Sequence, residues 1–192
     1  MQYKKKFISD NIIKAGKDEF LEKGYRGGNI ANIAVRANVP VGNLYRYFDG
    51  KAGLLDAIVK PVYTTVPAIA ASFAQMGADK NISVEELMRL LAVRLLETFD
   101  KYGEELLILA DKCITTRYED FTDIVVDKVL ELILVRIYTD PTETDKLMSR
   151  LIAKSFVSSL FDILRCKLSR EKTEEMLNRM LTYHFLNIEA RH

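Results

Sequence analysis

The stretch VPVGNLYRYFDGK, residues 39–51, decides how the N-terminal part of this chain folds. It contains one proline, two glycines and three aromatic residues, but only two cationic side chains. The pattern predicts a very short helix that ends near Phe48, with Leu44 and Phe48 facing a core at a spacing of four residues. The other side chains of that helix point elsewhere and need a different explanation: Val41, Asn43, Tyr45, Arg46 and Tyr47.

Two further helices are expected directly before this stretch. The apolar spacing predicts a helix over residues 7–23, which Gly24 ends. Asn29 then provides an N-cap for a second, short helix, which the sequence NVP breaks. The second and third helices, joined by ANVPV, have the proportions of a helix-turn-helix.

The rest of the chain also shows apolar residues at spacings of three and four, which predicts an all-α fold of about nine helices. The fourth helix begins near Gly50 or Lys51, and we expect Pro61 and Pro67 to kink or divide it. The segment GADKN, residues 77–81, is the clearest linker. Further helices are predicted over residues 83–102, 104–114, 119–138, 142–168 and 169–190.

Charge is distributed unevenly along the 192 residues. Residues 1–55 hold 10 Lys or Arg and 5 Asp or Glu, a net charge of +5, whereas the remainder carries −4. This asymmetry indicates that the N-terminal segment faces a polyanion. The alternative is that the surface charges are distributed by chance. Without a long uninterrupted apolar run or a secretion signal, we expect no membrane span and a cytoplasmic protein. Cys113 and Cys166 are read as reduced, buried thiols, with redox sensing as the alternative.

The short third helix has the chemistry of a DNA-contacting element. Gly42 carries no side chain, so the helix can lie close against another surface. Tyrosine hydroxyls, the Asn43 amide and the Arg46 guanidinium are groups that bind phosphates and base edges. Lys51 falls in the first turn of the fourth helix, where backbone N–H groups also favour a phosphate. The alternative is an aromatic cluster that only fills a small core.

Residues 24–55, GYRGGNIANIAVRANVPVGNLYRYFDGKAGLL, resemble the DNA-binding signature of TetR-type transcriptional regulators, and the motif-level resemblance extends over residues 12–55. Beyond these residues, only the all-helical plan and the chain length agree with the family. Thirteen positions match in order and spacing: Gly24, Tyr25, Ile33, Ala34, Ala37, Val39, Gly42, Leu44, Tyr45, Tyr47, Phe48, Lys51 and Leu54.

The resemblance implies a dimeric regulator with a DNA-binding domain at residues 1–55 and an effector-binding and dimerisation domain at residues 56–192. Val41, Asn43 and Arg46 become candidate base contacts, and Tyr45, Tyr47 and Lys51 become candidate phosphate contacts. Gly42 and the N-cap residue Asn29 complete the predicted DNA-binding set. This chain departs from the family pattern at four places: Gly16, Gly28, the pair Pro40 and Val41, and the pair Ala52 and Gly53.

The two C-terminal helices carry apolar residues on more than one face, which predicts either a dimer formed through them or a central helix buried in a monomer. The predicted dimer residues are Leu160, Phe161, Leu164, Met176, Met180 and Tyr183. The resemblance also implies an apolar effector cavity for an unknown small molecule. Its candidate lining residues, which core packing would explain equally well, are Phe73, Met76, Met88, Phe99, Tyr102, Cys113, Tyr118 and Phe121.

The sequence therefore favours a DNA-binding transcriptional regulator, by family default a ligand-responsive repressor that binds a pseudo-palindromic operator on double-stranded DNA as a homodimer. A helical protein-interaction regulator with vestigial DNA binding is the alternative. We expect no enzyme, because motifs such as GxSxG, HExxH and GxxxxGK[ST] are absent from the sequence. No cofactor and no metal site are expected, since His184 and His192 are few and far apart.

Overall fold

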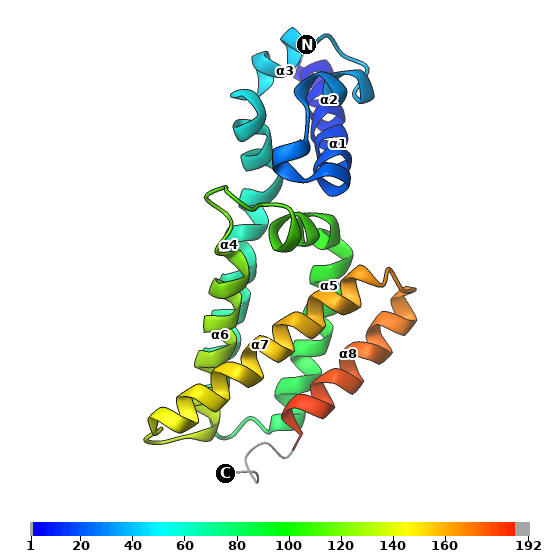
Figure 1. The fold of residues 1–192 in the computed structure, drawn as a ribbon. Helices are drawn as coiled ribbons and strands as arrows, with labels where there is room; N and C mark the ends of the chain where they lie inside the picture. Colours follow the sequence, from blue (N-terminus) through cyan, green and yellow to red (C-terminus); the bar gives the residue numbers. More distant parts are fainter. Residues whose placement is uncertain (1, 187–192) are drawn as a thin grey trace. The chain divides into compact units, whose positions relative to one another are not determined.

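The computed structural model describes residues 2–186, and the side chains of residues 5–186. Within that part of the chain all regular structure is α-helical, so the all-α prediction is confirmed (Figure 1). The eight helices are α1 (Gln2–Gly27), α2 (Ile30–Arg36), α3 (Val41–Tyr47), α4 (Gly50–Ala78), α5 (Val84–Asp111), α6 (Phe121–Ile137), α7 (Glu143–Arg165) and α8 (Arg170–Phe185). The last helix was predicted to reach residue 190, and residues 187–190 lie outside the described part.

Eight helices replace the predicted nine because two predicted segments join. Residues 83–102 and 104–114 were expected as separate helices, but both belong to α5. The backbone leaves helical geometry at Tyr102, where φ is −132° and ψ is 16°, and the helix resumes after it. From the sequence pattern, the interruption at Tyr102 is predicted as the end of a helix, but the helix continues on its far side.

The fourth helix is undivided, which excludes division, one of the two outcomes expected at Pro61 and Pro67. α4 runs as one helix from Gly50 to Ala78. Proline fixes φ near −65°, a helical value, and removes one backbone hydrogen bond, so a helix of 29 residues can continue through it. Residues 61–78 contain no Asp, Glu, Lys or Arg. By length and composition α4 alone among the described helices could cross a membrane, a test that core helices of soluble proteins also pass.

The described chain divides into two compact units. The first comprises residues 2–64 and Glu104–Glu119, and the second comprises Thr65–Gly103 and residues 120–186. α4 and α5 therefore each contribute residues to both units. We refer to residues 2–55 of the first unit as the head.

The head is built on local backbone signals that the sequence displays. Gly24, with φ of 68° and ψ of 172°, interrupts α1 where a residue with a side chain would be strained. Asn29 caps α2 as predicted, because its side-chain oxygen accepts a hydrogen bond of 2.7 Å from the backbone N–H of Ala31. α2 packs against both α1 and α3. Together these signals set the position of the short helix α3.

Two glycines that depart from the family pattern are explained by packing in this core. A Cβ atom at Gly28 would lie 2.9 Å from the ring of Phe20, which is fully buried. A Cβ atom at Gly16 would lie 2.9 Å from Cδ2 of Leu54. Both distances are shorter than van der Waals contact allows, so larger side chains elsewhere occupy the space that these glycines leave.

The second unit has its own apolar core. Phe73 of α4, Leu87 of α5 and Leu132 of α6 form one buried cluster. α6 packs against α7, and α7 packs against α8. In Figure 1, α7 is the yellow to orange helix and α8 is the orange to red helix beside it. The start of α7 is closed by a capping box between Thr142 and Asp145. The unit is thus a helical bundle of ordinary construction.

Candidate nucleic-acid interface

α3 buries one side chain and leaves most of the others accessible. Leu44 is fully buried, whereas Phe48, the second predicted core residue, is half-buried at the C-cap. Of the predicted DNA-binding residues on α3, Val41 is 41% exposed and Tyr45 is 62% exposed. Gly42 and Arg46 are also exposed, and Asn43 and Tyr47 are half-buried. Leu44 is therefore the one buried side chain that packs α3 into the head, and most of the polar and aromatic side chains of α3 are accessible.

Gly42 faces open space. A Cβ atom built at this position meets no atom within 4 Å, so nothing within the described residues demands a glycine there. Gly42 also lies in helical conformation, in which glycine is less stable than alanine by about 1 kcal/mol. A glycine that the fold does not require is consistent with close approach of a partner.

We expect the substitution Gly42→Ala to stabilise the free protein and weaken DNA binding. The gain in unfolding free energy should be about 0.5–1 kcal/mol, because helix propensity improves and no atom is displaced. A methyl group forced into a close contact with DNA should cost about 1–3 kcal/mol, roughly five- to 150-fold in affinity. Urea denaturation and fluorescence anisotropy with labelled DNA measure the two effects, and unchanged affinity would exclude close approach at Gly42.

Arg36 and Arg46, two arginines of the head, differ in whether they form an ion pair within the protein. Arg36 forms two hydrogen bonds of 2.8 and 2.6 Å to the carboxylate of Glu22. This pairing raises the pKa of Arg36 and lowers the pKa of Glu22. Arg46, in contrast, is exposed and forms no ion pair among the residues that the structure describes. Its guanidinium is therefore available to a partner, while that of Arg36 is held within the head.

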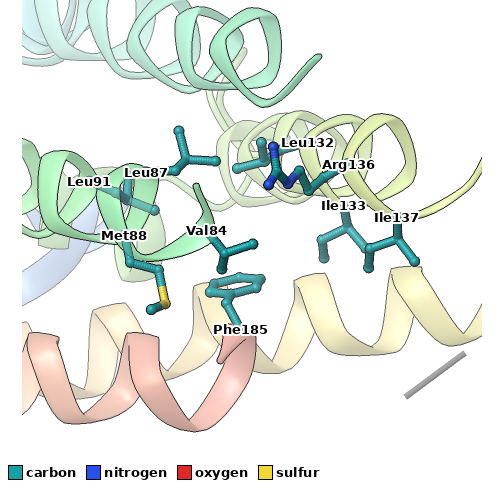
Figure 2. Close-up of a pocket in the computed structure, with 9 residues that line it drawn as sticks. All are labelled: Val84, Leu87, Met88, Leu91, Leu132, Ile133, Arg136, Ile137 and Phe185. Carbon is teal, nitrogen blue, oxygen red and sulfur yellow. The ribbon is translucent and has the colours of Figure 1, made fainter. Parts of the chain in front are cut away.

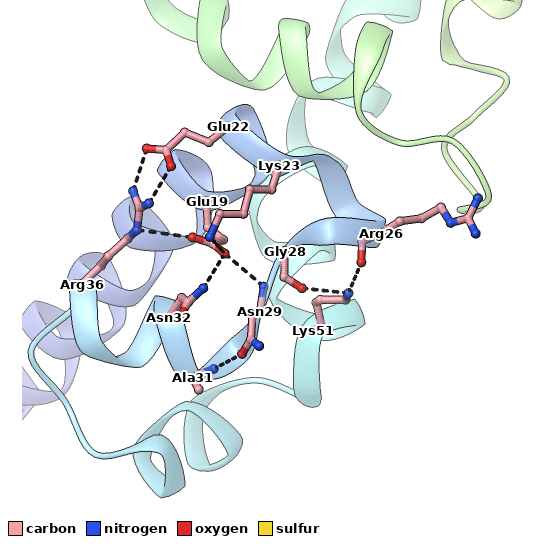
Figure 3. A network of polar contacts seen from close by, with 10 residues as sticks. All are labelled: Glu19, Glu22, Lys23, Arg26, Gly28, Asn29, Ala31, Asn32, Arg36 and Lys51. Carbon is pink, nitrogen blue, oxygen red and sulfur yellow. Dashed lines mark hydrogen bonds and ion pairs between the residues drawn. The ribbon is translucent and has the colours of Figure 1, made fainter.

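Lys51, expected to contact a phosphate, lies in a different environment. Its ammonium group donates hydrogen bonds to the carbonyl oxygens of Gly28, at 3.0 Å, and Arg26, at 3.4 Å (Figure 3). It also lies 4.7 Å from the ring centre of Tyr25. In this arrangement Lys51 joins the first turn of α4 to the last turn of α1 and to the loop that follows α1. The sequence could not show this, because the acceptors are backbone carbonyls.

The residues predicted to line an effector cavity are distributed over both units. Cys113 and Tyr118 are buried in the first unit, where the Tyr118 hydroxyl donates a hydrogen bond of 2.8 Å to Asp56. The others lie in the second unit, where Phe73 and Phe121 are buried. Met76, Met88, Phe99 and Tyr102 are half-buried there.

One small apolar cavity lies within the second unit (Figure 2). Its volume is about 40 Å³, and Met88 is the one predicted effector residue among those that line it. Its walls come from α5, α6 and the end of α8, so residues far apart in sequence meet there: Val84, Leu87, Met88, Leu91, Leu132, Ile133, Arg136, Ile137 and Phe185. Sequence spacing detects apolar faces, but it does not show which faces leave space between them.

The two cysteines are expected to react very differently. Burial raises the pKa of the Cys113 thiol to about 11, against an ordinary value of 9.0, so it stays protonated at pH 8. Cys166 was also expected to be buried, but it is exposed at the C-cap of α7, where the helix ends at the surface. Iodoacetamide at pH 8 should label Cys166 in the native protein and Cys113 only after denaturation, as read by peptide mass spectrometry. Equal native labelling would contradict the burial of Cys113.

The predicted dimer residues divide into buried and exposed sets. Leu160, Phe161 and Met180 are buried within their own unit, and Leu164 is half-buried. Met176 is 41% exposed and Tyr183 is 78% exposed. Apolar residues on α7 are also exposed, namely Leu147, Met148 and Leu151.

A surface groove of about 520 Å³ lies between α7 and the end of α8. Leu151, Ile152 and Tyr183 contribute its apolar walls. His184 also lines it, half-buried, with its ring centre 5.6 Å from that of Phe156. His192 lies outside the described residues. The described part of the chain contains no group of three His, Cys, Asp or Glu that could hold a metal ion.

The sequence of the head is similar to that of a known protein family. Residues 12–58 match the family described as bacterial regulatory proteins, tetR family. A curated relative, the HTH-type transcriptional repressor DhaR of Mycobacterium sp. (strain GP1), is 23% identical over 96 residues. That match covers 50% of this chain and 47% of DhaR, so the chain spans about half the length of this relative.

Solved structures with the same fold extend over nearly the whole chain. NalD of Pseudomonas aeruginosa, described as the secondary repressor of the MexAB-OprM multidrug efflux pump, is 20% identical with a TM-score of 0.63, covering 98% of this chain and 100% of NalD. A transcriptional regulator of Aquifex aeolicus VF5 is 17% identical with a TM-score of 0.58, covering 93% of this chain and 99% of that one. Residues 12–58 are thus similar in sequence to the tetR family of bacterial regulatory proteins, and the chain shares its fold with these solved structures.

Proposed function

We propose that this protein is a sequence-specific DNA-binding transcriptional regulator, and more narrowly a ligand-responsive repressor that binds a pseudo-palindromic operator as a homodimer in the cytoplasm. The observation that carries the proposal is α3, a helix with exposed Arg46 and Tyr45 and with open space at Gly42, inside a tetR-family head. We propose residues 1–55 as the DNA-binding domain and residues 56–192 as the effector-binding and dimerisation domain. No enzymatic activity is proposed.

Individual contacts follow from the chemistry of the side chains. Arg46 has the donor geometry to bind a guanine through two hydrogen bonds, and Asn43 can pair with an adenine. Val41 offers a methyl group to thymine. The hydroxyls of Tyr45 and Tyr47 suit phosphate oxygens. The ammonium group of Lys51 has three N–H donors, of which two are directed to the carbonyl oxygens of Arg26 and Gly28, so the third can contact a phosphate.

The experiment that tests the function is selection of duplexes from a random pool by the purified protein at about 150 mM salt, near physiological ionic strength. Sequencing and footprinting should recover a pseudo-palindrome whose half-sites lie about 34–36 Å apart. Affinity should fall steeply as salt rises, since phosphate contacts release counterions. Binding without any sequence enrichment would contradict the proposal, and absence of salt-dependent DNA binding would favour a regulator that acts through protein partners.

We propose that a second copy of the chain covers the exposed apolar residues of α7 and α8. A stable interface needs a contiguous patch with an apolar centre, and Leu147, Leu151, Met176 and Tyr183 offer the exposed apolar groups. The variant Leu151→Asp/Tyr183→Asp should be monomeric by sedimentation velocity. The matched control is Val93→Asp on α5, where the valine is 51% exposed. A dimer that survives the double substitution would exclude this face.

We propose that the effector is a small, apolar molecule that enters the second unit and lowers DNA affinity by moving α4. The cavity at Met88 has a volume of about 40 Å³, whereas pockets for drug-sized ligands measure about 300–1,000 Å³. Binding therefore requires the helices around the cavity to separate. The uncharged dye Nile red should gain fluorescence with the protein, and Met88→Trp, which fills the cavity, should reduce that gain.

A further inference from the structure

A single carboxylate lies at the centre of the head. Glu19 of α1 is fully buried, and no other acidic side chain among the described residues is. Three donors converge on its Oε1 atom: Nζ of Lys23 at 2.9 Å, the backbone N–H of Asn29 at 3.2 Å and Nδ2 of Asn32 at 3.3 Å (Figure 3). Its Oε2 atom lies 3.3 Å from Nε of Arg36. The carboxylate is thus enclosed by polar partners on α1 and α2.

This arrangement keeps Glu19 ionised although it is buried. Burial raises the pKa of the carboxyl group, but hydrogen bonds from Lys23, Asn32 and Asn29 outweigh that effect and lower the pKa below its ordinary value of 4.5. A buried charge of this kind does little to increase stability, because the cost of removing it from water offsets much of the attraction. Its presence in the core of a small head therefore calls for another explanation.

The partners of Glu19 lie at both ends of α2. Asn29 is the N-cap of α2, Asn32 lies in its first turn, and Arg36 is its last residue. Apolar contacts between α1 and α2 are not directional, so they resist separation of the helices more than rotation or sliding. Hydrogen bonds to one fixed carboxylate are directional and resist both movements. Because α2 packs against α3, the position of α2 influences that of α3.

We propose that Glu19 is a positioning residue of the DNA-binding head, whose buried carboxylate fixes the rotation and axial position of α2 on α1 and thereby aims α3. The inference rests on the proposed DNA-binding function. It assigns to Glu19 no contact with DNA. Its role is to reduce the freedom of α3, so it contributes to discrimination between base sequences more than to attraction for the phosphate backbone.

The test compares full-length Glu19→Leu with the wild-type protein. Removing one partner of a buried ion pair is destabilising when the other charge stays buried. The side chains of Lys23 and Arg36 are 41% and 35% exposed, so water can solvate both cations, and leucine fills a similar volume. The variant should therefore remain folded. The probes are the duplex selected by the wild-type protein and a scrambled duplex of equal length. The ratio of the two affinities should fall about tenfold, the size of the effect of one mismatched base pair. The salt dependence of binding to the scrambled duplex should stay unchanged.

The control is Glu22→Gln. Glu22 lies on the same helix and pairs with Arg36, but it has no bond to Asn29 or Asn32 among the described residues, and its side chain is 54% exposed. This variant should retain the wild-type affinity ratio. An unchanged ratio in folded Glu19→Leu would overturn the proposal. The proposal would also be overturned if Glu19→Leu were less stable but its folded fraction kept the wild-type affinity ratio. That result would show that Glu19 stabilises the head without aiming α3.

A second measurement tests the geometry without DNA. In Glu19→Gln, the side chain keeps its shape and loses its charge, so the hydrogen bond from the Asn29 amide should weaken. Amide hydrogen exchange by NMR in the free protein should be faster at Asn29 and along α2 than in the wild-type protein. If the wild-type protein selects no duplex, the proposed function fails, and this exchange measurement decides the positioning role by itself. Unchanged exchange at Asn29 would overturn it.

Discussion

Phe20→Ala is expected to lower the free energy of unfolding of the head by about 3–5 kcal/mol. Phe20 is fully buried, its ring centre lies 5.9 Å from that of Tyr25, and it fills the space above Gly28. Removing the ring leaves a cavity that α1 and α2 cannot close, because both helices are fixed by the polar contacts of Glu19. A loss of this size is a large part of the stability of an ordinary domain.

The measurement is urea denaturation followed by far-ultraviolet circular dichroism, together with amide exchange of α2 to report on the head itself. The matched control is Phe7→Ala on the same helix, where the phenylalanine is 59% exposed, and a change below about 0.5 kcal/mol is expected. Similar losses for the two variants would show that the core of the head is not organised around Phe20. DNA affinity should fall with the folded fraction of the Phe20→Ala head.

Arg46→Ala is expected to cost about 1–3 kcal/mol of binding free energy on the selected duplex, roughly five- to 150-fold in affinity. The guanidinium of Arg46 is exposed and without an ion pair within the described residues, so nothing in the free protein has to be broken before it binds. The loss should concentrate at one base pair of each half-site, where the variant should accept other bases more readily.

The control for Arg46→Ala is Arg94→Ala on α5, an arginine whose side chain is 53% exposed in a pair with Glu97. Both substitutions remove one positive charge, so a difference between them reflects position and not net charge. Binding measured against duplexes with single base changes separates the two roles of Arg46. Equal weakening on all duplexes would assign Arg46 to the phosphate backbone and remove it from base reading.

Local chemistry made much of the head predictable. The cap at Asn29, the interruption at Gly24 and the burial of Leu44 depend on residues close together in sequence, and the structure shows all three. Phe48, which was also expected in the core, is half-buried. The continuity of α4 through Pro61 was not predictable in the same way. A proline weakens one hydrogen bond locally, but packing along the whole helix decides whether the helix ends.

The sequence predicted which residues belong to the candidate site better than it predicted the contacts that they form. Spacing identified α3 and its exposed polar residues, but it missed Glu19, because a glutamate in an amphipathic helix normally faces water. It also gave no sign that the ammonium group of Lys51, predicted to contact a phosphate, binds two backbone carbonyls. The cavity at Met88 depends on the ends of three helices that meet only in the folded chain. Partners that are distant in sequence or part of the backbone leave no local pattern.

The contact between Gly28 and Phe20 has a consequence for how this head can diverge. A Cβ atom at Gly28 would also lie 3.1 Å from the carbonyl oxygen of Gly24, so the ring is not the only obstacle to a larger residue. A related protein with threonine at this position must carry a smaller or shifted side chain at position 20 and a different course of the loop after α1. The two positions should therefore change together during evolution, and a graft of one without the other should lower the stability of the head by about 1–3 kcal/mol.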